Sequence, residues 1–371
     1  MQAEFSLDRR RRDMAPDLRR AMRRARLAHG AFYLDQLREM LVLGLWHHGL
    51  EPAEYYQYGL CDQGRHDPAA RRSFVGQRGR WGCGPLALSP AVTSRLGFER
   101  MMRGQGLPVA HTLARYGGSG PPAGVRHLAD AAALGRFLRE SADRRLFGKP
   151  LVRAEGACVL PVEGWEPATD RIRLGRGRTA SVLRLQRLLE PFAGDGYLFQ
   201  ARLDTHADLA PLLIGALCTV RVLACRRGRE LGLHRASWRI PAAGNDTDCF
   251  STPGNLLGAV DPETGRVWRV VDDVHPRQRV VDAHPDSGLP LHRTLPDWTT
   301  LRATVLAAAE LFPATPCVAF DVALTDDGPV LLSMAEGAGN PLLLQLAQDR
   351  GLDDGAPIGD AQPAPTPRRA A

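Results

Sequence analysis

The single lysine of this chain is the residue whose type most strongly suggests chemistry. The sequence contains 48 lysine and arginine residues, and Lys149 is the one lysine among them. A compact ammonium on a flexible stem binds phosphate as a point charge, whereas a guanidinium presents a planar fork. Lys149 is therefore a candidate for binding a polyphosphate. The alternative is that one lysine has remained at this position by chance.

The residues around Lys149 are compatible with a phosphate-binding hairpin. Residues 147–151 are followed by small residues between 154 and 157, and a second apolar stretch runs over 158–162. A strand, a small-residue turn and a second strand can place an ammonium and several backbone N–H groups around phosphate oxygens. The pattern is neither a Walker loop nor a dinucleotide-binding fingerprint. A hairpin with an incidental lysine is the alternative.

A later stretch could hold an adenine ring. Residues 197–203, Tyr-Leu-Phe-Gln-Ala-Arg-Leu, follow a helix predicted over 180–192 and have the composition of a strand. Such a strand offers backbone donors and acceptors to an adenine edge, and Gln200 adds a side-chain contact. Considered alone, the same stretch favours an ordinary strand of the core over an adenine site.

The elements that must position these residues alternate without a regular βαβ rhythm, which favours an α+β fold with antiparallel sheets. Residues 16–49 predict one long helix, or two helices broken near Gly30. A helical turn follows at 51–58. Further helices are predicted over 90–106, 129–141, 180–192 and 299–311. A strand is predicted from Val109, and a hairpin of two strands over 147–161. The remaining predicted strands are 171–174, 197–203, 219–225, 230–240, 267–271, 318–325 and 330–334.

The order of these features resembles the ATP-grasp fold, in which two α+β lobes close on ATP. The resemblance is specific to the sugar-transfer-associated ATP-grasp family, which is related to glutamate ligases, and it covers residues 31 to 352. It is carried by several short stretches: Glu54-Tyr55-Tyr56, Cys218-Thr219-Val220-Arg221, Trp238-Arg239-Ile240, the loop from Asn245 to Asp248-Cys249-Phe250, where Cys249 replaces the usual asparagine, the turns at 260–265 and 284–288, the helix start at 295–298, and the hairpin 320–332.

The resemblance implies a nucleotide site. Lys149 would bind the α- and β-phosphates, and Gln200 with the backbone around Ala201 and Leu203 would hold the adenine. Arg95 stands where many ATP-grasp proteins have an earlier lysine near the nucleotide, and an exposed helix arginine is the alternative there.

The resemblance also implies a metal and a catalytic pair. Asp321 would ligate Mg²⁺, which prefers hard oxygen ligands from one or two carboxylates. Arg221 and Arg239 would be the catalytic residues, facing the γ-phosphate or a substrate carboxylate and stabilising the charge of the transferred phosphoryl group. His206 matches a family histidine that follows the hinge strand, which corresponds here to residues 197–203. The alternative is that His206 has only a packing role.

The chain departs from the family at the second metal ligand. The glutamate and asparagine that close the family's metal site are replaced by Ser333 and Ala335, while Glu336 and Asn340 follow shortly after. One interpretation is that the flexible stretch 336–340 turns Glu336 inward as a replacement ligand. The other is that the second ligand is lost and catalysis is weakened.

Composition and charge narrow the class of protein. The seven scattered cysteines form no CxxC pair and are interpreted as buried thiols in a reducing compartment. The apolar stretches are too short to span a bilayer, so we expect a cytoplasmic protein. The net charge of +7 suggests an anionic partner, but the arginines before residue 27 lack interleaved aromatics. They are interpreted as a solvated helix face, so nucleic acid is an unlikely partner. A nucleic-acid-binding arm, which rests on charge alone, is the alternative.

These inferences together predict three regions and one function. Residues 1–85 form a basic helical region, 86–352 the ATP-grasp domain, and 353–371 a disordered Pro/Ala-rich tail. The predicted function is an ATP- and Mg²⁺-dependent ligase acting on small-molecule or saccharide-linked carboxylates and amines, through an acyl phosphate. The alternative is a degenerate ATP-grasp module that binds nucleotide in a glycan or natural-product pathway without ligating. The sequence leaves the oligomeric state open.

Overall fold

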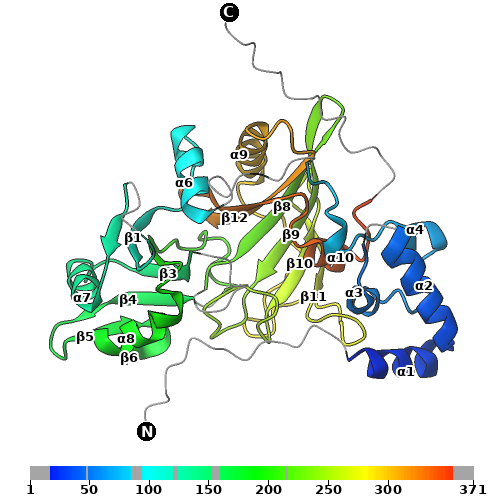
Figure 1. Ribbon diagram of the computed structural model, residues 1–371, viewed down its shortest axis with the longest axis horizontal. Coiled ribbons are helices and arrows are strands. Elements are labelled where there is room, and N and C mark those ends of the chain that lie inside the picture. Colours follow the sequence, from blue (N-terminus) through cyan, green and yellow to red (C-terminus); the bar gives the residue numbers. More distant parts are fainter. Residues whose placement is uncertain are drawn as a thin grey trace, which may run out of the picture.

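The structure is a computed structural model that describes residues 17–46, 49–84, 88, 94–119, 124–151, 159–213 and 216–353. Two β-sheets dominate these residues (Figure 1). The predicted C-terminal tail and the first part of the basic N-terminal region lie outside the described residues, as does most of the small-residue turn after Lys149.

Four helices form the N-terminal region, and they pack beside the second sheet (Figure 1). The first two are separated at Gly30, which ends its helix with φ of 69°, a value that glycine adopts without strain. Of the two predicted arrangements, the broken helix is therefore the one observed. Buried tyrosines from 55 to 58 join this region to Leu342 near the chain's end. The helices are α1 (Leu18–His29), α2 (Tyr33–Trp46), α3 (Pro52–Gln57) and α4 (Pro68–Arg72).

The first sheet has seven strands and its own core. One pair, β1 and β2, is parallel and the other pairs are antiparallel. Helices α7 (Ala131–Glu140) and α8 (Val182–Leu189) cover it (Figure 1), and each buries an apolar stripe against the strands. The strand order is β2 (Arg126–Leu128), β1 (Thr112–Tyr116), β7 (Tyr197–Ala201), β3 (Leu146–Pro150), β4 (Leu160–Glu166), β5 (Arg171–Leu174) and β6 (Arg178–Ala180).

The second sheet has six antiparallel strands, several of them longer. Helices α6 (Arg95–Gly104) and α9 (Trp298–Glu310) pack against one face, and α10 (Pro341–Gln348) packs against the other. The strand order is β11 (Val267–Val271), β10 (Leu256–Val260), β9 (Glu230–Ile240), β8 (Thr219–Arg227), β12 (Cys317–Thr325) and β13 (Gly328–Glu336).

The predicted α+β layout with antiparallel sheets is confirmed, and the predicted bounds of β5, β9 and β11 match those observed. β10 and α10 were not predicted from the sequence. The five residues of β10 are all buried, so they show no alternation of apolar and polar positions. The strand predicted from Val109 begins instead at Thr112, and Val109 makes an isolated bridge to Leu331. No helix among the described residues combines the length and apolarity that a membrane span requires.

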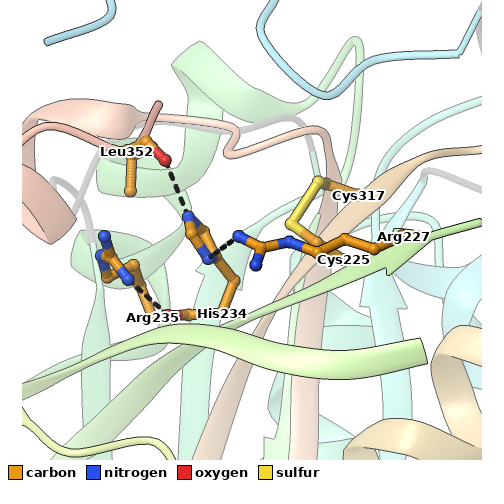
Figure 2. The surroundings of a disulfide bond; sticks show 6 residues. All are labelled: Cys225, Arg227, His234, Arg235, Cys317 and Leu352. Carbon is orange, nitrogen blue, oxygen red and sulfur yellow. Dashed lines mark hydrogen bonds between the residues drawn. A yellow bond between two sulfur atoms is a disulfide. The ribbon is translucent and has the colours of Figure 1, made fainter. Parts of the chain in front are cut away.

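The interpretation of the cysteines as free thiols is wrong for two of them. Cys225 on β8 and Cys317 on β12 form a disulfide, because the register of these neighbouring strands places the two residues opposite each other (Figure 2). They are 92 positions apart in sequence, so spacing alone gave no signal. Of the free cysteines in the described chain, Cys61 and Cys218 are buried, while Cys83 and Cys249 are half-buried. Cys158 lies outside the described residues.

Candidate active site

A cavity of about 750 Å³ lies between the two sheets. Strands β3 and β7 of the first sheet line one side, and β8, β9, β12 and β13 of the second sheet line the other. The cavity brings together most of the residues predicted to form the site: Arg95, Lys149, Gln200, Ala201, Leu203, Arg221, Arg239 and Asp321.

Lys149 reaches the cavity from β3, an interior strand of the first sheet, where it pairs with Leu198. Its exposed fraction is 7%. Burial lowers the pKa of Lys149 to about 7, and the nearby charge of Arg95 acts in the same direction. The charges of Glu99 and Asp321 partly offset this. An ammonium held this way lacks a full counter-charge, so an anionic ligand in the cavity would stabilise it.

Asp321 lines the same cavity from the second sheet. The register of the neighbouring strands places its hydrogen-bond partners beside it. Asp321 pairs with Arg221 on β8 and with Ser333 on β13. Arg221 donates from Nε to Oδ1 at 3.0 Å and from Nη2 to Oδ2 at 3.2 Å, a bidentate geometry. Ser333 Oγ donates to Oδ2 at 2.8 Å, and Arg239 from β9 also donates to Oδ1.

The charge of this group follows from its partners. Burial alone would raise the pKa of Asp321, but the charges of Arg221 and Arg239 outweigh burial. The hydrogen bonds from Arg221 and Ser333 act in the same direction. The pKa of Asp321 therefore lies well below its usual range, and the residue is a carboxylate at neutral pH.

Asp248 is a second carboxylate of the cavity, and no role was predicted for it from the sequence. It lies in the loop between β9 and β10 and accepts a hydrogen bond from the Thr219 hydroxyl. Burial raises its pKa, with the charge of Asp321 adding to the effect and that of Arg239 opposing it. Asp248, Asp321 and Arg239 thus act on one another electrostatically. Its place in the Asp-Cys-Phe stretch was the available signal.

The same loop connects the two sheets. Asp246 accepts hydrogen bonds from Arg176 Nε at 3.2 Å and from Arg178 Nη2 at 2.8 Å. Both arginines belong to the first sheet's β5–β6 connection and β6. All but 7% of the Asp246 side chain is buried. This contact fixes one wall of the cavity relative to the other.

The predicted adenine strand lies at the centre of the first sheet as β7. Gln200 is buried there, and its amide donates to the Thr112 hydroxyl at 2.9 Å. The Ala201 N–H donates to the His111 carbonyl, so the sheet already uses this donor. Gln200, Ala201 and Leu203 all line the cavity, where the chain leaves the sheet.

Two further predicted positions have different surroundings. Arg95 is the first residue of α6 and lines the cavity, close enough to lower the pKa of Lys149. His206 is not among the lining residues. Its backbone N–H donates to the Leu324 carbonyl, and its ring lies 3.7 Å from Asp297. These contacts agree with the packing alternative for His206.

The structure does not bring Glu336 to Asp321. Side chains alternate along β13, so Glu336 shares the face of Met334, which packs in the α9 core, while Ser333 faces Asp321. The Glu336 carboxylate instead accepts from the Gly84 N–H at 3.0 Å and the Leu88 N–H at 3.4 Å. Asn340 does line the cavity, and its side chain caps α10.

Comparisons with known proteins agree with this geometry. Residues 192–356 match the sugar-transfer associated ATP-grasp family. The matched range begins just before β7 and includes Arg221, Arg239, Asp248 and Asp321. The predicted resemblance to this family is therefore confirmed over this range, and the predicted ATP-grasp fold is confirmed with it. The sequence has no significant match among curated proteins.

Several solved structures are similar at low identity. D-alanyl-alanine synthetase A from Vibrio cholerae matches with 12% identity and a TM-score of 0.39, covering 71% of this chain and 62% of that one. The D-alanine-D-alanine ligase from Coxiella burnetii matches with 10% identity and a TM-score of 0.34, covering 71% and 58%. An L-amino acid ligase from Bacillus licheniformis matches with 11% identity and a TM-score of 0.35, covering 75% and 54%. The chain thus covers less than two thirds of each of these proteins.

Proposed function

We propose that this protein, whose residues 192–356 match the sugar-transfer associated ATP-grasp family, binds Mg·ATP between its two sheets and activates a substrate carboxylate for attack by an amine. The γ-phosphoryl group passes to the carboxylate oxygen, giving an acyl phosphate and ADP. The amine nitrogen then attacks the acyl carbon, so an amide forms and phosphate leaves, while the amine's surplus protons pass to solvent.

The observation that carries this proposal is the position of Lys149 opposite the charged group around Asp321. A buried ammonium on the first sheet and a buried carboxylate with two arginines on the second sheet line one cavity. Cationic side chains outnumber carboxylates in the cavity lining, which suits a triphosphate. Phe147 on β3, Ala201 at the end of β7 and Leu203 after it are apolar lining residues against which an adenine ring can pack.

The residues present also fit a magnesium ion. Mg²⁺ prefers oxygen ligands and is commonly held by one or two carboxylates together with substrate phosphates. Asp321 and Asp248 both line the cavity, and each influences the charge of the other. We assign the two carboxylate ligands to this pair instead of to Asp321 and Glu336. When bound, the ion would neutralise charge on the phosphate oxygens.

The chain's own residues would orient the reacting groups. Lys149 would hold phosphate oxygens from the first sheet by charge alone, with Arg95 beside it. Arg221 and Arg239 would stabilise the charge on the transferred phosphoryl group from the second sheet. Both arginines are already positioned by Asp321, so little reorganisation is needed when the substrate arrives.

The direct test is nucleotide binding followed by turnover. The full-length protein is titrated with ATP in the presence of Mg²⁺, and the same titration is repeated with Lys149→Ala. ATPase activity is then screened over candidate carboxylates and amines, with product mass as the readout. We expect binding to weaken by at least about tenfold in Lys149→Ala, or about 1.4 kcal/mol.

Asp282→Asn is the matched control for changes at Asp321. Asp282 is an exposed aspartate that contacts His292, far from the cavity lining. We expect ATP turnover to disappear in Asp321→Asn and to persist in Asp282→Asn. Failure of the wild-type protein to bind ATP with Mg²⁺, or identical binding by Lys149→Ala, would contradict the proposal.

Nucleotide binding without ligation is the second candidate function. The observation that favours it is the engagement of Asp321 by Arg221, Arg239 and Ser333, where Ser333 stands in place of the family's glutamate. A carboxylate held by two arginines is less available to a metal ion. Stoichiometric ATP binding with no turnover over the full substrate screen would support this candidate. Turnover that Asp321→Asn abolishes would exclude it.

A further inference from the structure

Three metal-binding side chains meet far from the active-site cavity. His29, Cys61 and His275 each offer one ligand atom, and these atoms all lie within 4.8 Å of one another. Tetrahedral zinc sites have metal–nitrogen bonds of about 2.0 Å and metal–sulfur bonds of about 2.3 Å, so small side-chain movements would bring all three atoms into contact with one ion. No other group of this kind occurs among the residues that the structure describes.

The three residues come from separate parts of the chain. His29 is the last residue of α1, Cys61 follows α3, and His275 lies in the loop after β11. A second cavity, of about 350 Å³, is lined by all three residues. It offers an ion a route to the cluster. His29 is exposed and Cys61 is buried, so a bound ion would lie at the boundary between solvent and core.

The surroundings include the type of partner that orients metal-binding histidines. His29 Nδ1 lies 3.5 Å from the Asp62 carboxylate. A carboxylate beside one ring nitrogen fixes the ring and leaves the other nitrogen for the metal, an arrangement common in zinc sites. Asp62 directly follows Cys61 in sequence, so one short turn supplies both a ligand and an orienting group.

We propose that His29, Cys61 and His275 bind one divalent cation of the zinc class, with Asp62 orienting His29 and with a fourth position left for water. One thiolate and two imidazoles form a ligand set that favours Zn²⁺ over Mg²⁺ or Ca²⁺, which require oxygen ligands. On binding, the Cys61 thiol loses its proton to solvent and a metal–sulfur bond forms. The ion joins helix α1 and the 272–280 loop of the second sheet.

The charges near the cluster are mixed. Arg20, Arg24 and Arg277 line the second cavity together with Asp17, and Asp62 lies beside His29. Arg65 Nη1 lies 3.2 Å from His275 Nδ1. Arg65 also donates to Asp349 and Gln278, so it keeps two partners if the metal takes that nitrogen.

The test uses Co²⁺ as the probe, with the full-length protein under reducing conditions and with saturating Mg²⁺ to fill oxygen-lined sites. Cobalt bound by a thiolate gives a sulfur-to-metal charge-transfer absorption that carboxylate sites lack. We expect one equivalent of Co²⁺ to bind with this absorption, and Zn²⁺ to displace it. His29→Gln and His275→Gln should each weaken binding by at least about tenfold, and Asp62→Asn by about 10–100-fold.

Matched controls separate the cluster from general effects. Cys61→Ser should remove the charge-transfer absorption, whereas Cys83→Ser, which changes a half-buried cysteine elsewhere, should leave it unchanged. His292→Gln, an exposed histidine paired with Asp282, serves the same purpose for the imidazoles. Circular dichroism confirms that each variant is folded. Absence of the absorption in the wild-type protein, or its persistence in Cys61→Ser, would overturn the proposal.

Discussion

The two sheets that enclose the cavity supply charge in different ways. The first sheet contributes Lys149 from a short strand, where burial lowers its pKa and its neighbours compensate only in part. The second sheet contributes Asp321 on a nine-residue strand, where two arginines and a serine satisfy both carboxylate oxygens. One side therefore presents an incompletely compensated charge, and the other presents a satisfied network.

This difference predicts that the two sheets contribute differently to ligand binding and to folding stability. A network of buried, paired charges stabilises the fold only while every partner is present. Removing one partner leaves the remaining charges buried and unpaired. A buried charge without a full partner costs stability and becomes favourable when a ligand supplies the opposite charge. Changes on the second sheet should therefore affect folding first, and changes at Lys149 should affect ligand binding first.

The largest effect is expected from Asp321→Asn. The substitution removes the buried carboxylate charge that Arg221 and Arg239 share, so we expect the free energy of unfolding to fall by about 3–5 kcal/mol. Urea unfolding of the full-length protein measures the change. The exposed control Asp282→Asn should stay within about 0.5 kcal/mol of wild type. Equal stability of Asp321→Asn and wild type would show that the network contributes nothing to folding.

Lys149→Met should weaken ATP binding without lowering the stability of the fold, in contrast to Asp321→Asn. Methionine fills a similar volume without a charge, so we expect the free energy of unfolding to stay constant or rise while ATP affinity falls by at least about tenfold. Urea unfolding and ATP titration of the same preparation test the expected stability and the expected loss of affinity. Lys149→Arg is the companion variant, because it keeps the charge with a different shape. A destabilised Lys149→Met protein would remove the contrast between the two sheets.

The pH dependence should also arise from Lys149. Its pKa is lowered from 10.5 to about 7 in the folded protein, so between these pH values the unfolded chain binds more protons. The contribution of Lys149 to the free energy of unfolding therefore becomes more favourable as pH rises through this window. ATP affinity should change in the other direction, falling by up to about tenfold per pH unit above pH 7 as the ammonium loses its proton.

Lys149→Met provides the reference for that measurement, because other groups titrate as well. ATP affinity and unfolding free energy are measured at several pH values between about 6.5 and about 9.5 for both proteins. The difference between them isolates the contribution of Lys149. A difference that does not vary with pH would show that the Lys149 ammonium has its ordinary pKa.

The smallest effect is expected at the contact between the sheets. Asp246→Asn weakens the ion pairs to Arg176 and Arg178, both of which are partly exposed, so we expect a loss of about 1 kcal/mol or less. ATP affinity should fall slightly, because the cavity walls become less well fixed. Asp170→Asn, which breaks an exposed pair with Arg139 within the first sheet's own layer, should leave ATP affinity unchanged.

Much of the site was accessible from sequence because it depends on residue type and order. Strands were predicted at the positions of β3, β7 and β12, which carry Lys149, Gln200 and Asp321. All three residues line the cavity. Long strands such as β9 were predicted with their observed bounds because their apolar and β-branched residues are local properties of the chain.

What the sequence could not supply depends on register. Glu336 does not reach Asp321 because the β12–β13 register places Ser333 opposite Asp321, and side-chain alternation along β13 turns Glu336 to the other face. The same holds for Cys225 and Cys317, which form a bond because β8 and β12 pair with those two residues opposite each other. Residue identity and local element type are therefore determined along the chain, whereas the partners of each side chain are decided by pairings between strands that lie far apart in sequence.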